Sequence, residues 1–319
     1  MEQNGRNGLE LCEAFWHTYG EPMLRERFPE LLPLICSGLV GAGSECFGYD
    51  DELSRDHDFD VGFCLFLPDE TLVDRKTEFA LERAYAKLPS EFEGVKRPPL
   101  NPVGGNRHGV IRISDFLSQK TGKSDGTLSL CDWFFIPEQS LLEATNGKLF
   151  YDGLGAMSAA RERLSYFPED VRRKKLAGNL LLAAQSGQYN YARSVRRGES
   201  GAAQLALSEF VSSVLHAIFL LNRRYLPYYK WSFRALRELP LLSECEGDLT
   251  YLISSGNTAD EVTLKSKIIE EISKKLTDEL RAQGLSEREG VELEAHAYAV
   301  NDRIFDESVR NLHILYAVG

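Results

Sequence analysis

The glycine-rich stretch Gly43-Ser44-Glu45-Cys46-Phe47-Gly48 and the acidic stretch Asp56-His57-Asp58-Phe59-Asp60 decide how the chain is interpreted. An apolar run over residues 34–40 precedes the glycines, and a second apolar run over 61–67 follows the acids. Glycine lets the backbone approach a ligand closely, and Ser44 adds a hydroxyl beside free amides, a combination that suits a phosphate. The order therefore predicts two short buried strands with a phosphate-binding turn between them.

The acids that follow the turn predict a metal site. Alternate residues of a strand share a face, so Asp56 and Asp58 are expected to point the same way, about 7 Å apart along the chain. Two carboxylates held this close repel each other unless a hard cation lies between them, and Mg²⁺ is the usual cation beside phosphates. A solvated turn before a strand is the alternative interpretation of the same residues.

A third acid lies in the apolar segment 128–137, which we expect to be a core strand. Asp132 is the one charged residue in the middle of this segment, and a lone acid in a core strand is costly unless it is paired or binds a metal. The alternatives are that Asp132 caps a turn or pairs with an arginine.

Length and composition favour a soluble cytoplasmic protein of two domains. The chain has 319 residues, of which 43% are hydrophobic, enough to fill two cores. No apolar run approaches membrane-spanning length, and residues 1–20 lack a signal-peptide pattern, so no membrane partner is expected. The net charge of −11 disfavours broad nucleic-acid binding. Six scattered cysteines without Cys-x-x-Cys spacing predict buried, reduced thiols.

The predicted fold class is α+β: a small mixed β-sheet domain over residues 1–155, followed by an all-helical domain over 156–319. The first domain begins with a helical pattern over 9–28 that Gly20 and Pro22 are expected to break. The helical domain carries two polar clusters, around Arg193 and around Lys230. Solvated charge is the default interpretation of both, but they also suit a triphosphate on the opposite wall of a cleft.

The glycine-serine turn and the Asp-x-Asp pair together resemble the signature of the DNA polymerase β-like nucleotidyltransferase superfamily. Further phrases resemble one uncharacterised bacterial family, known only as a domain of unknown function with a nucleotidyltransferase fold. The likeness covers most of residues 33–239. Its phrases are 43–50, 54–58, Asp132-Trp133 with Pro137 and Gln139, 147–153, 193–199 and 225–231.

This resemblance implies a polymerase β-like fold, two Mg²⁺ ions and a nucleoside triphosphate donor, with ATP expected. It also implies a third carboxylate on a neighbouring strand, for which Asp132 is the candidate. One departure concerns the residues after Asp-His-Asp, where the family has an aromatic residue and then Gly-Pro. Here Phe59 is followed by Asp60, so Asp58 and Asp60 are an alternative metal pair. The spacing from Ser44 favours Asp56 and Asp58.

The function expected from these features is transfer of a nucleoside monophosphate from the triphosphate to an acceptor hydroxyl. A likeness in layout to aminoglycoside and lincosamide nucleotidyltransferases favours a small-molecule acceptor. Nucleotidylation of tRNA or protein is one alternative, and a nucleotide-binding module without chemistry is another. The residues assigned are Asp56, Asp58 and Asp132 for metal binding and catalysis, and Gly43, Ser44, Lys230 and Arg193 for the phosphates.

Overall fold

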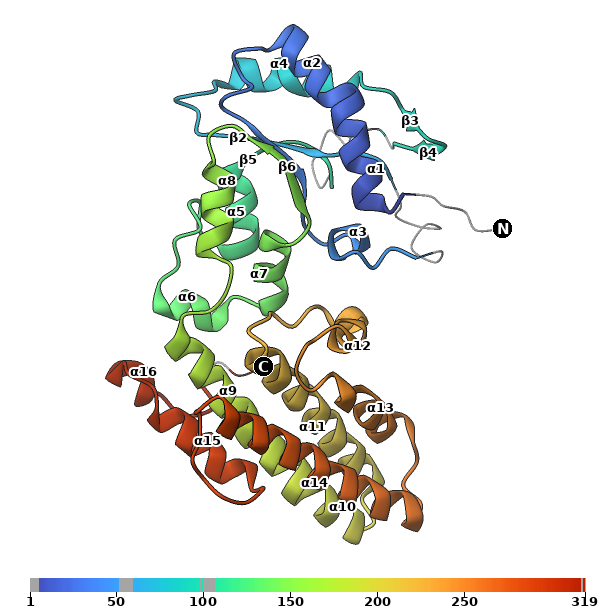
Figure 1. The fold of residues 1–319 in the computed structure, drawn as a ribbon, viewed down its shortest axis with the longest axis vertical. Coiled ribbons are helices and arrows are strands. Elements are labelled where there is room, and N and C mark those ends of the chain that lie inside the picture. The colour runs from blue at the N-terminus through green and yellow to red at the C-terminus, as the bar shows by residue number, and fades with distance from the viewer. Residues whose placement is uncertain (1–5, 52–59, 98, 100–106, 317, 319) are drawn as a thin grey trace. The chain divides into compact units, whose positions relative to one another are not determined.

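The computed structural model describes residues 6–51, 60–97, 99, 107–316 and 318. The chain forms two compact units (Figure 1). Unit 1 comprises residues 1–129 and 140–165, and unit 2 comprises 130–139 and 166–319. A small mixed sheet lies in the N-terminal part and the C-terminal region is helical, which confirms the α+β class.

Unit 1 is built on a four-stranded sheet with the order β5-β2-β1-β6. The central strand β1 is antiparallel to both β2 and β6, and β2 is parallel to β5. A separate hairpin pairs β3 with β4. The strands are β1 (Cys36–Leu39), β2 (Cys64–Leu67), β3 (Glu91–Phe92), β4 (Val95–Lys96), β5 (Gly109–Arg112) and β6 (Lys148–Asp152).

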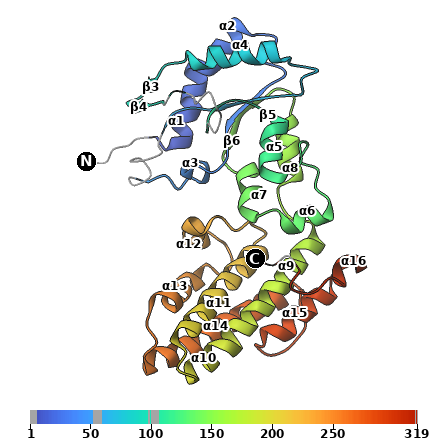
Figure 2. The same cartoon turned by 180° about the vertical axis from the view of Figure 1, so that it is seen from behind.

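Side chains of β2 alternate between two helical layers, as a strand buried on both faces requires. Leu65 and Leu67 belong to the core cluster formed with the N-terminal helices. Phe66 points to the opposite face, where its ring lies 5.2 Å from that of Phe116. In both views α1, α2 and α4 cover one face of the sheet, and α5 and α8 cover the other (Figures 1 and 2). These helices are α1 (Gly8–Phe15), α2 (Glu21–Arg27), α4 (Arg75–Ala86), α5 (Ile113–Thr121) and α8 (Ala156–Arg163).

The N-terminal helical run continues through Gly20 and Pro22, so the predicted break is wrong. A π-helical segment (Trp16–Gly20) joins α1 to α2, and the Glu21 amide bonds to the carbonyl five residues earlier. Pro22 then lies in the first turn of α2, where its missing N–H is tolerated. A Cβ on Gly20 would lie 2.5 Å from the Phe63 ring, so glycine is needed for the run to pack on the sheet.

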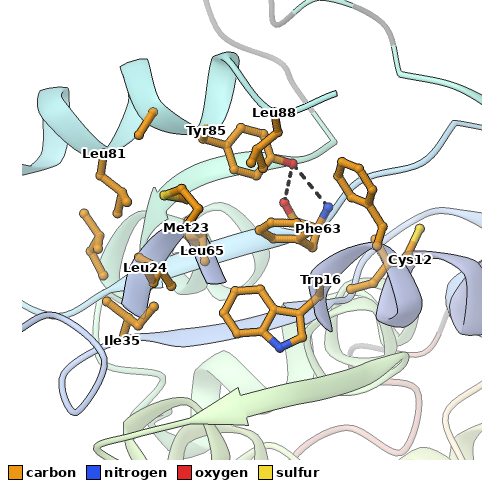
Figure 3. Close-up of a cluster of buried hydrophobic side chains, with 14 of the residues drawn as sticks. Cys12, Trp16, Met23, Leu24, Ile35, Phe63, Leu65, Leu81, Tyr85 and Leu88 are labelled. Carbon is orange, nitrogen blue, oxygen red and sulfur yellow. Dashed lines mark hydrogen bonds between the residues drawn. The ribbon is translucent and has the colours of Figure 1, made fainter. Parts of the chain in front are cut away.

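The core beneath this run fixes the entrance to β2 (Figure 3). The Phe63 ring lies 5.2 Å from Trp16 and 5.0 Å from Tyr85 in edge-to-face contacts. The buried Tyr85 hydroxyl donates to the Phe63 carbonyl at 2.7 Å and accepts from its amide at 3.2 Å. One side chain of α4 therefore satisfies both backbone groups of the residue just before β2.

Unit 2 consists of helices, with α9 packed between α11 and α15. A π-helical segment, η2 (Ala184–Tyr191), connects α9 to α10. Gly187 in η2 lies so close to α11 that a Cβ would be 2.3 Å from the Phe210 ring. The helices of its longer segment, 166–319, are α9 (Glu169–Ala183), α10 (Ala192–Arg196), α11 (Ser200–Leu221), α12 (Tyr229–Arg237), the 3₁₀ turn η3 (Ser243–Cys245), α13 (Glu246–Ser254), α14 (Ala259–Ala282), α15 (Leu293–Asp302) and α16 (Glu307–Arg310).

Helix α11 changes one expectation from the sequence. Its 22 residues are long and apolar enough to cross a membrane, whereas no such run was expected. Of the most apolar stretch of this helix, 61% is buried inside the structure. The helix packs against α9 and η2. The core helix of a soluble protein can have the same length and apolar composition. The apolar character of α11 is accounted for by its place in the core of unit 2.

Candidate functional site

Four chain segments meet at one edge of the sheet in unit 1. Because β1 and β2 are antiparallel with Gly38 opposite Cys64, the turn after β1 lies beside the entrance to β2. The parallel pairing of Cys64 with Gly109 brings the entrance to β5 to the same edge. The pairing of Leu39 with Lys148 does the same for the entrance to β6. We call this edge the turn edge.

The predicted glycine-serine turn forms the first part of the turn edge. After β1 the chain turns at Gly41, whose φ of +121° favours glycine, and a short helix α3 (Ser44–Phe47) begins directly after Gly43. Gly48 ends α3 in the left-handed conformation, with its amide bonded to the Glu45 carbonyl. Ser44 is half-buried in the first position of this helix.

Asn146, just before β6, fixes the turn from the other side. Its side-chain oxygen accepts the Gly41 amide at 2.9 Å, and its side-chain nitrogen donates to the Gly41 carbonyl at 2.7 Å. The Gly147 amide donates to the Cys46 carbonyl at 2.9 Å. Arg161 of α8 donates to the Asn146 carbonyl at 2.6 Å, which in turn holds Asn146. The backbone of the turn is thus held by three hydrogen bonds from the segment before β6.

An ion pair between Glu45 and Arg107 crosses the turn edge. The Glu45 side chain is buried, and a Cβ on Gly43 would lie 2.2 Å from the Arg107 guanidinium. The two charged groups thus occupy the space that a side chain at position 43 would enter. The ion pair also leaves the Glu45 carboxylate engaged with a cation of the protein itself.

A second polar pair, Asp60 and His108, joins the entrances to β2 and β5. Asp60 Oδ1 accepts a hydrogen bond from His108 Nε2 at 2.7 Å, and the two side chains are 18% and 5% exposed. Burial acts to raise the pKa of the Asp60 carboxyl, but the hydrogen bond and charge of His108 outweigh it, so this pKa lies below its usual value. A Cβ on Gly62 would lie 2.7 Å from the His108 ring, so glycine makes room for the imidazole.

The thiols around the turn edge have no nucleophilic character. Burial raises the pKa of Cys12 and of Cys64 to about 12, and raises that of Cys36 and Cys46 as well. A thiol with such a pKa is protonated at neutral pH, and the thiolate is the reactive form. Five of the six cysteines are buried and all six are free, which agrees with the sequence prediction; Cys131 is the exposed one.

The predicted metal pair lies outside the described residues, because the structure does not describe 52–59. Asp60, the alternative ligand, is described and is hydrogen-bonded to His108. Among the residues that are described, no group of three or more histidines, cysteines or acids is arranged to hold a metal ion. The roles of Asp56 and Asp58 remain predictions.

The predicted core strand around Asp132 is wrong. Residues Leu130–Phe135 form a helix, α6, in which Asp132 is half-buried in the first turn, and α6 belongs to unit 2 rather than to the sheet. The aromatic residues of this segment pack instead against unit 2 residues that lie between or after helices. Trp133 contacts Phe167 at 5.9 Å, and Phe134 contacts Tyr316 at 5.5 Å. The strands beside β2 are β1 and β5, and neither residues 36–39 nor residues 109–112 include an acid.

The two predicted phosphate contacts of unit 2 are not brought together. Arg193 is exposed on α10, just before α11, with its guanidinium 5.9 Å from the Tyr189 ring. Lys230 is exposed on α12, after α11, with its ammonium 4.7 Å from the Trp231 ring. The intervening helix α11 has 22 residues, so it is about 33 Å long. A single triphosphate does not reach both cations, and the spacing along the sequence gave no sign of this separation.

Comparison with known families supports only the likeness to an uncharacterised domain family. The profile of a family described as a domain of unknown function (DUF4037) matches residues 133–232. This range includes Trp133, β6, the cluster around Arg193 and the segment that ends at Lys230, but neither the glycine-serine turn nor the acidic stretch. A search of curated proteins finds no match.

Proposed function

We propose that this protein is a Mg²⁺-dependent nucleotidyltransferase that moves a nucleoside monophosphate from a triphosphate, with ATP expected, to a hydroxyl of a small molecule. One observation carries the proposal. The antiparallel pairing of β1 and β2 brings the turn with Gly43 and Ser44 to the edge where β2 begins, and the acidic stretch shortly precedes β2 in the sequence. Phosphate contacts and carboxylates at one edge are what phosphoryl chemistry requires.

Asn146 bonds both backbone groups of Gly41, which restrains the turn that is proposed to hold the phosphates. In the proposed reaction Ser44 and the backbone of this turn bind the donor phosphates, and Lys230 neutralises charge on the leaving pyrophosphate. Because α11 is about 33 Å long, Arg193 lies too far from Lys230 to contact the same triphosphate.

The proposed metal ligands are Asp56 and Asp58, with Asp132 as the third acid. Bound Mg²⁺ supplies charge neutralisation at the phosphates and a lowered pKa of the acceptor hydroxyl. Asp60 already accepts a hydrogen bond from the buried His108, which favours Asp56 and Asp58 over the pair that includes Asp60. Acid clusters of this kind suit Mg²⁺, which prefers oxygen ligands.

Labelled nucleotides test the proposal directly. The purified protein is incubated with each labelled nucleoside triphosphate, Mg²⁺ and a cell extract split into small molecules, RNA and protein. Label in the small-molecule fraction with matching pyrophosphate release is the expected result. Label in RNA or protein would identify the alternative acceptors. Asp58→Asn should abolish transfer with an unchanged or higher melting temperature, since it relieves carboxylate repulsion. A fully active Asp58→Asn would refute the assigned metal pair.

A nucleotide-binding module without chemistry is the second candidate, and the lack of an acid in residues 109–112 of β5 favours it. A module needs two carboxylates to hold one Mg²⁺ against the phosphates, whereas a transferase needs a further acid for the acceptor side. Asp132→Ala distinguishes the two. Retained nucleotide affinity with turnover reduced by several orders of magnitude supports the transferase. Nucleotide binding with no pyrophosphate from the wild type, whichever triphosphate and extract are supplied, supports the module.

A further inference from the structure

Glu138 is a buried acid of unit 2 that the proposed reaction does not use. It is the first residue of α7 (Glu138–Thr145), and its side chain is 8% exposed. Both carboxylate oxygens have partners. Oε1 accepts from His216 Nδ1 of α11 at 3.0 Å, and Oε2 accepts the backbone amide of Leu226 at 2.9 Å. A buried carboxylate is costly unless it is bonded in this way, and these two contacts give each of its oxygens a hydrogen-bond donor.

Leu226 lies in the connection from α11 to α12, which carries Lys230. On one side of Leu226, Tyr225 is buried, with its ring 4.9 Å from Phe167. On the other side, Pro227 has no amide to donate, and Tyr228, Tyr229 and Lys230 are exposed. The bond from Glu138 to Leu226 is therefore a polar attachment immediately before the exposed part of the connection.

The charge of Glu138 acts on three titratable groups of unit 2. Burial, reinforced by the charge of Glu138, raises the pKa of Tyr166 and of Tyr225, so both hydroxyls stay neutral. Burial lowers the pKa of Lys175 while the charge of Glu138 opposes that change, and Lys175 Nζ donates to the Phe134 carbonyl of α6 at 3.2 Å. Glu138 thus lies between the helix that carries Asp132 and the connection that leads to Lys230.

We infer that Glu138 is a positioning residue: it fixes the connection 225–231 and, through it, the place of the Lys230 ammonium. The second step rests on the proposed function, in which Lys230 contacts the donor phosphates. The first step is independent of it, since it concerns hydrogen bonds within unit 2. Two experiments on the full chain separate the steps.

Amide hydrogen exchange tests the first step. In the wild type the Leu226 amide should exchange slowly although it belongs to no helix, and rapid exchange there would overturn the inference even without a variant. In Glu138→Ala its exchange should accelerate about 10- to 150-fold, the equivalent of a hydrogen bond to a charged acceptor. Glu138→Gln keeps an oxygen that can accept this amide, so it should restore most of the protection.

Asp170→Ala is the matched control, because Asp170 also holds backbone amides of unit 2. It accepts the amides of Phe305 at 3.1 Å and Asp306 at 2.8 Å. Exchange should accelerate at those two residues and stay unchanged at Leu226. Faster exchange at Leu226 in the control would mean that any loosening of unit 2 releases the connection, which would overturn a specific role for Glu138.

A double-mutant cycle on MgATP affinity tests the second step. Glu138→Ala and Lys230→Ala should each weaken binding, by about tenfold if a charged contact is lost, and the double variant should be no weaker than Lys230→Ala. Additive losses would overturn the link from Glu138 to Lys230. If Lys230→Ala binds MgATP like the wild type, the donor contact of the proposed function and this second step fail together. The exchange result then still decides the first step.

Discussion

At the scale of single residues, the turn edge is held together by pairs that cross between chain segments. Asp60 with His108, and Glu45 with Arg107, each join segments that are 48 and 62 residues apart in the sequence. Asn146 reaches Gly41 across 105 residues. Each of these contacts replaces water around a buried polar group, so its loss leaves a partner unsatisfied. The stability of the protein should therefore fall when a charged side chain at the turn edge is replaced by an uncharged one of the same shape.

Asp60→Asn tests this sensitivity. At neutral pH the variant should be less stable than the wild type by about 1.5–3 kcal/mol, because it weakens a hydrogen bond of the buried His108. The pKa of Asp60 is lower in the folded protein than in the unfolded chain, so its contribution is present at neutral pH and is lost as pH falls through the folded pKa.

The stability difference between wild type and Asp60→Asn should accordingly shrink below about pH 4, the usual range for an unfolded aspartate. Urea unfolding of both proteins at neutral and acidic pH measures it. A difference that stays constant on acidification would show that the Asp60 charge does not contribute.

At the scale of elements, glycines mark where two elements approach too closely for a side chain. Gly147, just before β6, has φ of +62°, and a Cβ there would lie 2.0 Å from the Leu39 carbonyl of β1. Gly155, just before α8, has φ of +69° with no heavy atom within 4 Å of the same position. A side chain would strain the backbone at both positions, but it would meet a neighbouring atom only at Gly147.

This pair separates strain from contact in unit 1. Gly155→Ala should cost about 1 kcal/mol for the left-handed conformation alone. Gly147→Ala should cost about 3 kcal/mol or more, since β6 must also shift away from β1. Thermal unfolding of both variants measures the difference. Equal costs would mean that β6 moves without resistance, contrary to a turn held by Asn146.

A corresponding pair tests the packing of η2 in unit 2. Gly187→Ala should destabilise by about 1–3 kcal/mol, because its Cβ would press on the fully buried Phe210 ring. Gly201→Ala, in the first turn of α11 with nothing within 4 Å, should stabilise by about 0.5–1 kcal/mol. Urea unfolding measures both. If Gly187→Ala leaves the free energy of unfolding unchanged, the π-helical segment must adjust its register.

The local elements of unit 1 were predictable where the pattern was local. The strands around 36–39, 64–67, 109–112 and 148–152 follow from apolar runs bounded by turn residues. The segment around Asp132 was not predictable in the same way, because a short apolar run fits a buried strand or a buried helix equally well. Its aromatic partners, Phe167 and Tyr316, are distant in the sequence. The partners His108, Arg107 and Asn146 were missed for the same reason, since the register of the sheet brings them to the turn edge.

At the scale of the whole molecule, the chain passes between the two units three times, after residues 129, 139 and 165. Helix α6 lies in the short segment 130–139, which belongs to unit 2 although unit 1 residues precede and follow it. Tyr316 also contacts Phe135 of α6, at 5.4 Å. Unit 2 is therefore assembled from two separate segments of the chain.

A fragment experiment follows from this connectivity. Residues 166–319 expressed alone lack Trp133 and Phe134, two buried rings of α6 whose loss costs about 3–5 kcal/mol each. That is a large part of the 5–15 kcal/mol typical of a folded domain. The fragment should unfold at a lower temperature or aggregate, and joining residues 130–139 to it through a flexible linker should restore a cooperative transition. Equal stability with and without α6 would contradict its place in unit 2.

The same connectivity sets a waiting time during synthesis. Phe134 leaves the ribosome well before Tyr316, which lies 182 positions further along the chain, and at about 5–20 residues per second this stretch takes roughly 10–40 s to synthesise. During that interval the aromatic side of α6 has no C-terminal ring to cover it, while β6, needed to complete the sheet, emerges soon after α6. The sheet can thus form early, whereas the packing of α6 in unit 2 is completed only after Tyr316 has been synthesised. Slow translation of the second half would prolong the exposure of the aromatic side chains of α6, which favour aggregation while they are uncovered.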